Sequence, residues 1–166
     1  MRAILLAAIA AVLVQPFVFA LGLLPLLFVH PTPNLNGLGL VFAAVLVVSV
    51  AFVVALGVPI FLLLRRLGRV SWASLSLAGF LAGAVPVALL AWPRHLEGYS
   101  SGYNWFGHAV DFYIDGVPTI YAWLSYAEGT IISGIHGLVG AVVFLAVWRR
   151  VHAADHSGRS FRSHAV

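Results

Sequence analysis

Four uncharged, apolar runs limit what this chain can fold into. They cover residues 3–29, 38–64, 72–92 and 129–148. Each run is long enough to cross a hydrocarbon core about 30 Å thick as a helix. Lipid offers the backbone no hydrogen-bond partners, so a spanning segment must be a helix unless the chain closes into a barrel. The alternating pattern of a barrel is missing from these runs. The sequence therefore predicts an all-α integral membrane protein with four transmembrane helices.

The composition excludes a soluble globular domain. Hydrophobic residues make up 62% of the chain and charged residues only 8%, whereas about a quarter of the residues in soluble domains are charged. All nine basic residues are arginines that lie outside the apolar runs. We therefore interpret them as topology determinants and expect no nucleic-acid partner. The absence of cysteine excludes disulfides and thiolate metal sites.

The arginines are distributed unevenly between the two sides of the four runs. Arg65, Arg66 and Arg69 lie in the short link between the second and third runs, and most of the others lie near the chain ends. The links on the opposite side hold one arginine, Arg94, and four of the five acidic residues. Arginine-rich loops remain in the cytoplasm, so we expect both termini to be cytoplasmic. The arginine-only, alanine-rich composition favours a bacterial inner membrane.

The chain divides into a membrane domain, residues 1–151, and a polar tail, residues 152–166, for which we predict disorder. Within the membrane domain, small residues recur at four-residue intervals in the third and fourth runs. This spacing places them on one helix face and allows close backbone contact. We expect the third and fourth helices to pack together through these residues, with a homo-oligomer contact as the alternative. The residues are Gly79, Gly83, Gly129, Ser133 and Gly137.

Two larger polar side chains interrupt the apolar runs. Gln15 lies in the middle of the first run and precedes Pro16. We expect its amide to bond to a backbone carbonyl or to a neighbouring helix. His136 lies in the fourth run, and an ionisable residue within a membrane helix is a candidate functional residue. No other histidine lies inside a run, so we interpret His136 as a hydrogen-bonding residue and expect no haem or other cofactor.

The external segment, residues 93–128, carries nine aromatic residues. Between residues 104 and 115 the apolar residues follow a helical period, which predicts an amphipathic helix lying on the membrane surface between the third and fourth spans. Aromatic side chains are enriched at the cores of protein interfaces. The candidate partner-binding residues are Tyr103, Trp105, Phe106, Phe112 and Tyr113.

The polar face of this predicted helix contains a possible metal site. His108, Asp111 and Asp115 are spaced at i, i+3 and i+7, which would align one imidazole and two carboxylates along one stripe of a helix. Such a set could hold a metal ion. The alternative, which we favour, is the solvated face of an interfacial helix.

These observations favour a small non-enzymatic membrane protein with an accessory role. It would be a subunit, an assembly factor or an immunity-type protein, and its external segment would bind a partner. The expected partners are membrane lipids and another membrane or periplasmic protein, or a second copy of the chain. Two alternatives stay open. One is an oligomeric conduit for ions or small molecules, and the other is a membrane enzyme using His108, Asp111 and Asp115 at the outer surface.

Overall fold

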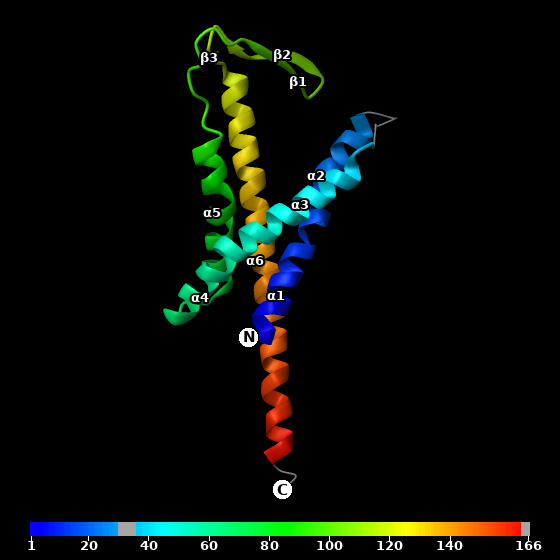
Figure 1. Ribbon diagram of the computed structural model, residues 1–166, viewed down its shortest axis with the longest axis vertical. Helices are drawn as coiled ribbons and strands as arrows, with labels where there is room; N and C mark the ends of the chain where they lie inside the picture. The colour runs from blue at the N-terminus through cyan, green and yellow to red at the C-terminus, as the bar shows by residue number, and fades with distance from the viewer. Residues whose placement is uncertain (30–35, 164–166) are drawn as a thin grey trace.

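The computed structural model describes residues 1–29 and 36–163, with side chains for residues 1–24 and 36–154 (Figure 1). The first apolar run forms α1 (Arg2–Leu13) and α2 (Gln15–Val29). The second forms α3 (Leu38–Phe52), a π-helical turn η1 (Val53–Gly57) and α4 (Val58–Arg66). The third forms α5 (Trp72–Leu90), and the fourth lies within α6 (Ile120–Ser163).

Four helices in the described part of the chain are long and apolar enough to cross a membrane, as predicted. They are Arg2–Leu24, Leu38–Arg66, Trp72–Leu90 and Ile120–Ala154. The last one begins before residue 129, where the fourth apolar run was predicted to start. It also continues into the predicted disordered tail, because α6 ends only at Ser163. No proline follows Pro118 in the sequence to interrupt this helix. The last three tail residues, 164–166, lie outside the described residues.

Breaks in the first two runs occur close to their prolines. Val14 separates α1 from α2 just before Pro16. In the second run, η1 ends at Gly57, and Pro59 follows within continuous helical backbone, where its missing N–H and its ring interrupt the regular hydrogen-bond ladder. Each run is therefore a pair of shorter helices that can bend at its junction. Figure 1 shows α3 and α4 running obliquely to α5 and α6, which lie side by side.

Capping residues set the beginnings of α5 and α6. The Ser71 hydroxyl accepts a bond from the Ser74 backbone N–H (3.0 Å), and the Ser74 side chain accepts one from the Ser71 N–H (3.0 Å), a complete capping box. Thr119 Oγ1 accepts a bond from the Tyr121 N–H (3.2 Å) and donates to the Asp111 carbonyl (2.6 Å). Thr119 therefore joins the start of α6 to the segment that precedes it.

The prediction of an interfacial helix is wrong, because residues 101–118 form a small antiparallel sheet. β1 (Ser101–Trp105), β2 (His108–Ile114) and β3 (Val117–Pro118) pair in sequence order. A two-residue turn, Phe106–Gly107, joins the first two strands, and both residues have positive φ (49° and 85°). This backbone fits the right-handed twist of a hairpin. Val110, Phe112 and Ile114 alternate with other residues, the period of a strand.

The buried core lies where α1, α4 and α5 meet the middle of α6. Ala7 and Ala11 of α1 let that helix approach closely, and Phe61 of α4 is fully buried there. The Phe61 ring lies 4.8 Å from the Phe144 ring and 5.2 Å from the Trp148 ring of α6. In contrast, α3 has no buried residue, so the second run is held mainly by its α4 end.

Candidate functional site

Small residues bring α5 and α6 into backbone contact. A Cβ atom built on Gly83 would lie 2.2 Å from the Ser133 carbonyl oxygen, and one on Gly137 would lie 2.1 Å from the Gly79 carbonyl oxygen. These distances are far below ordinary contact, so only glycine fits at these positions. Gly129 does not share the contact, because nothing lies within 4 Å of its Cβ position. The predicted rows thus pair Gly79 and Gly83 with Ser133 and Gly137, within one chain.

Gln15 and His136 form a polar link between the first and last apolar helices. The Gln15 side-chain Nε2 donates to the Ala11 carbonyl (3.2 Å) and to the His136 carbonyl (3.2 Å). Its Oε1 lies 2.8 Å from His136 Nδ1. Gln15 is only 6% exposed, and a buried amide without these partners would carry a large desolvation cost. The link therefore holds the start of α2 against α6.

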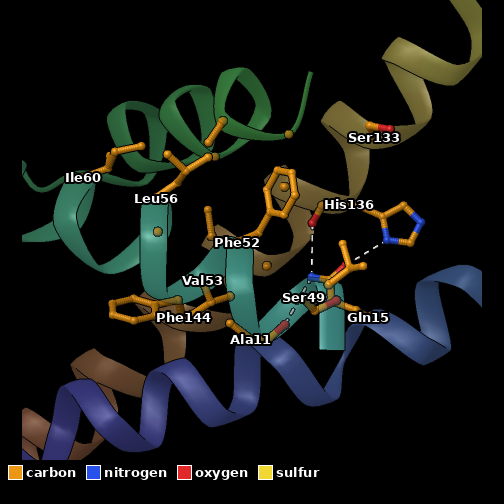
Figure 2. Close-up of a pocket in the computed structure, with 18 of the residues that line it drawn as sticks. Ala11, Gln15, Ser49, Phe52, Val53, Leu56, Ile60, Ser133, His136 and Phe144 are labelled. Atoms are coloured by element: carbon orange, nitrogen blue, oxygen red, sulfur yellow. Dashed lines mark hydrogen bonds between the residues drawn. The ribbon is translucent and has the colours of Figure 1, made fainter. Parts of the chain in front are cut away.

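These contacts define which imidazole nitrogen carries the proton. Both amide hydrogens of Gln15 face carbonyl oxygens, so its Oε1 must face the ring and can only accept. His136 Nδ1 therefore donates, and in a neutral ring Nε2 is left as an acceptor. Figure 2 shows the ring beyond Gln15 on the side away from Phe144. His136 is thus a structural hydrogen-bond donor through one nitrogen and keeps an acceptor on the other.

A cavity of about 500 Å³ lies next to this polar link. Apolar side chains of α3 and η1 form one wall, among them Phe52, Val53 and Leu56 (Figure 2). Small residues of α5 and α6 contribute to the opposite wall, among them Gly79 and Gly137. The polar side chains that line it are Gln15, Ser49, Ser133 and His136. Ser49 donates to the Val45 carbonyl of its own helix (2.6 Å), and the other lining residues are nearly all apolar. The surface of the cavity is therefore almost entirely apolar.

The crossing of the helices explains why the cavity exists. The small residues that bring α5 and α6 together leave little side-chain volume on the surface facing α3. The second run contacts the other helices through the edge-to-face pair of Phe19 and Phe42 (5.9 Å) and through η1 and α4, where Val53 and Phe61 pack at the core. Between these contacts α3 stands away from α5 and α6, and the space there remains open. No sequence pattern indicates this space, because it depends on the crossing geometry of the helices.

His108, Asp111 and Asp115 do not form a metal site in the described structure. Neighbouring residues of a strand point to opposite faces, so His108 and Asp111 of β2 lie on different sides of the sheet. Asp115 lies in the following turn with φ of 48°, and its N–H donates to the Ser100 hydroxyl (3.0 Å). Within residues 1–29 and 36–163, no three His, Cys, Asp or Glu residues are grouped so as to hold a metal ion.

Four of the five candidate partner-binding residues lie on one face and the tip of the hairpin. Tyr103 and Phe112 contact each other across the two strands (5.8 Å between rings), and Trp105 lies on the same face as Tyr103. Phe106 occupies the turn, 72% exposed. Tyr113 packs against Tyr99 (5.4 Å), which lies before β1. The structure therefore brings four of the five residues together, while Tyr113 packs against the segment before β1.

A contact that the sequence did not predict anchors the hairpin to α6. The Trp105 ring lies 5.5 Å from the Tyr121 ring, and Trp105 Nε1 donates to Glu128 Oε2 (3.4 Å). A second aromatic cluster joins the ends of α5 and α6, where Trp92 contacts Trp123 and Tyr126 (5.2 and 5.5 Å). The density of aromatic residues between 92 and 126 was the available indication, but it did not specify these pairs.

Comparison of the chain with protein-family models, curated proteins and solved structures gives no match.

Proposed function

We propose that the four apolar helices cross a bacterial inner membrane, with both termini in the cytoplasm. The distribution of arginines supports this orientation. Arg149 lies over the Trp72 ring (5.1 Å) and Arg65 over the Trp148 ring (6.0 Å), so arginines of α4 and α6 gather at one end of the structure. The hairpin lies at the opposite end (Figure 1). Cationic residues packed on interfacial tryptophans are typical of the membrane surface.

Within this topology, we propose a non-enzymatic binding role for the cavity between α3, η1, α5 and α6. Its occupant would be an apolar, single-chain molecule that enters from the bilayer. The observation that carries this proposal is a cavity of about 500 Å³ with an almost wholly apolar lining and one adjacent polar pair, Gln15 and His136. A large apolar pocket with a few convergent polar groups is the most common form of a ligand site.

The size of the cavity suits a small molecule. Its volume of about 500 Å³ falls within the range of roughly 300–1,000 Å³ for small-molecule sites. A flexible hydrocarbon chain suits a lining that is almost entirely apolar.

Two adjacent alanines of α3 allow a matched test. Ala44 lines the cavity and Ala43 does not, and both lie on the same exposed helix. We expect the purified wild type to bind a fluorescent polyene fatty acid saturably. The Ala44→Phe variant should lose most of this binding, because the phenyl ring enters the cavity, and Ala43→Phe should retain it. Equal binding by both variants would show that the probe binds elsewhere.

A second candidate function is the accessory role, in which a partner protein binds the external hairpin. The exposed side chains of Tyr103 and Phe106 (66% and 72%) favour it, since exposed aromatics are frequent anchors in interfaces. If this role is correct, a Tyr103→Ala and Phe106→Ala double variant should lose a protein that co-purifies with the wild type in mild detergent. The Asn104→Ala variant serves as the control on the intervening position.

A further inference from the structure

The pairing of β1 with β2 separates the side chains of the hairpin into two unlike faces. Tyr103 pairs with Val110, and Trp105 pairs with His108, so these four share one face, and Tyr103 also contacts Phe112 there. Asn104 pairs with Ala109, and Gly102 pairs with Asp111, on the other face. Directly paired residues point to the same side of a sheet. One face is therefore largely aromatic and aliphatic, and the other is small and polar.

The contacts of Trp105 show which way the apolar face points. Its ring packs on Tyr121, and its Nε1 donates to Glu128 (3.4 Å). Both partners lie on α6, in its first three turns. The apolar face is therefore the one turned back toward the helices, and the polar face is turned away from them. Figure 1 shows the hairpin extending sideways from the N-terminal end of α6, across the direction of that helix.

Two aromatic side chains on this side remain mostly exposed, although Tyr103 contacts Phe112 and Phe106 contacts Trp105. Tyr103 is 66% exposed although it shares a face with Val110 and Trp105, and Phe106 at the tip is 72% exposed. Phe106 also has a left-handed backbone (φ 49°), a conformation that Asn or Gly adopts more readily. A bulky, exposed aromatic in such a turn points to contact with something outside the chain.

We infer that the apolar face and tip of the hairpin rest in the headgroup region of the outer lipid leaflet, while its polar face remains in water. The direction of the face decides between lipid and protein as the occupant. The face looks toward the first three turns of α6, residues 120–128, which precede the uncharged apolar run that begins at residue 129. In the proposed topology, lipid headgroups surround the helix at this level. Tyr and Trp side chains favour this interface because their rings are amphipathic. The inference rests on the proposed topology.

The absence of cysteine allows a direct test in the full-length protein. Nitroxide labels are attached to four single-cysteine variants in liposomes of phosphatidylethanolamine and phosphatidylglycerol. Tyr103→Cys and Phe106→Cys probe the apolar face and tip, and Asn104→Cys probes the polar face. Val47→Cys, on the exposed surface of α3 (69% exposed), reports whether the helices are in the bilayer. Accessibility to oxygen, which concentrates in lipid, is compared with accessibility to a water-soluble nickel chelate.

We expect the ratio of oxygen to nickel accessibility to be severalfold higher at positions 103 and 106 than at 104. Water-like ratios at 103 and 106, with a lipid-like ratio at 47, would overturn the inference and leave the topology intact. Exclusion of both reagents from 103 and 106 would also overturn it, in favour of a protein on this face. A water-like ratio at 47 would refute the topology, and with it the inference. Because two positions probe the surface, misfolding of one variant leaves the test valid.

Discussion

Replacement of Gly137 by alanine tests whether the contact between α5 and α6 holds the structure together. The added Cβ would lie 2.1 Å from the Gly79 carbonyl oxygen, against an ordinary contact of 3.4 Å or more. The obstacle is a backbone atom, so no change of rotamer relieves it. The two helices must separate by about 1.3 Å, the difference between these distances. This movement would also weaken the neighbouring contact of Gly83 with Ser133.

The expected magnitude follows from two opposing effects. Overpacking of a well-packed contact costs about 1–3 kcal/mol. Alanine is favoured over glycine within a helix by about 0.5–1 kcal/mol. We therefore expect Gly137→Ala to lower the free energy of unfolding by about 1–2 kcal/mol. Gly129→Ala lies on the same helix with nothing within 4 Å of its Cβ, so it should be neutral or slightly stabilising.

Reversible unfolding in mixed micelles with increasing dodecyl sulfate, followed by circular dichroism, measures both variants under the same conditions. A difference of about 2 kcal/mol between them changes the folding equilibrium constant more than tenfold. Equal midpoints for Gly137→Ala and Gly129→Ala would refute the close contact. If the loss of stability depended on protein concentration, the contact would lie between two copies of the chain.

Two further substitutions test the polar link and the anchor of the hairpin. Gln15→Leu removes the hydrogen bonds to the Ala11 and His136 carbonyls and leaves His136 Nδ1 unpaired. Since hydrogen bonds between membrane helices contribute about 0.6 kcal/mol each on average, we expect a loss of about 1–2 kcal/mol in the same unfolding assay, and an unchanged midpoint would contradict the link. Trp105→Phe keeps an aromatic ring at this position but removes the hydrogen bond to Glu128. It should raise amide hydrogen exchange in residues 101–114 by severalfold while exchange in α5 stays constant.

The apolar runs could be read from the sequence because a spanning helix needs little more than length and hydrophobicity. Four runs were predicted and four helices of that kind are present in the described residues. The rows that contain Gly79 and Gly137 could also be predicted, since a spacing of four places small residues on one helix face whatever their environment. Gly129 fits the same spacing but lies beyond the contact, because the spacing says nothing about where two helices diverge.

The hairpin could not be separated from a helix by periodicity alone. Trp105 and Val110 lie on the apolar side whether residues 104–115 form a helix or two strands. The spacing of these residues was therefore consistent with an amphipathic helix. The distinguishing residues were Phe112, which only a strand places on that side, and Gly107, which permits the tight turn. The cavity was even harder to predict from the sequence. It arises from the oblique crossing of α3, which no local pattern encodes.

The π-helical turn η1 has a consequence for how the second run tolerates changes in length. A π turn holds one residue more than an α turn, and each residue rotates a helix by about 100°. The faces of α3 and α4 are therefore out of phase by one residue, and Phe61 reaches the core only because of this offset. Deletion of one residue from Val53–Gly57 would restore a regular helix and rotate Phe61 by about 100°, away from Phe144 and Trp148. The extra residue in η1 therefore sets the rotation of α4 relative to α3, so that each segment faces different neighbouring helices.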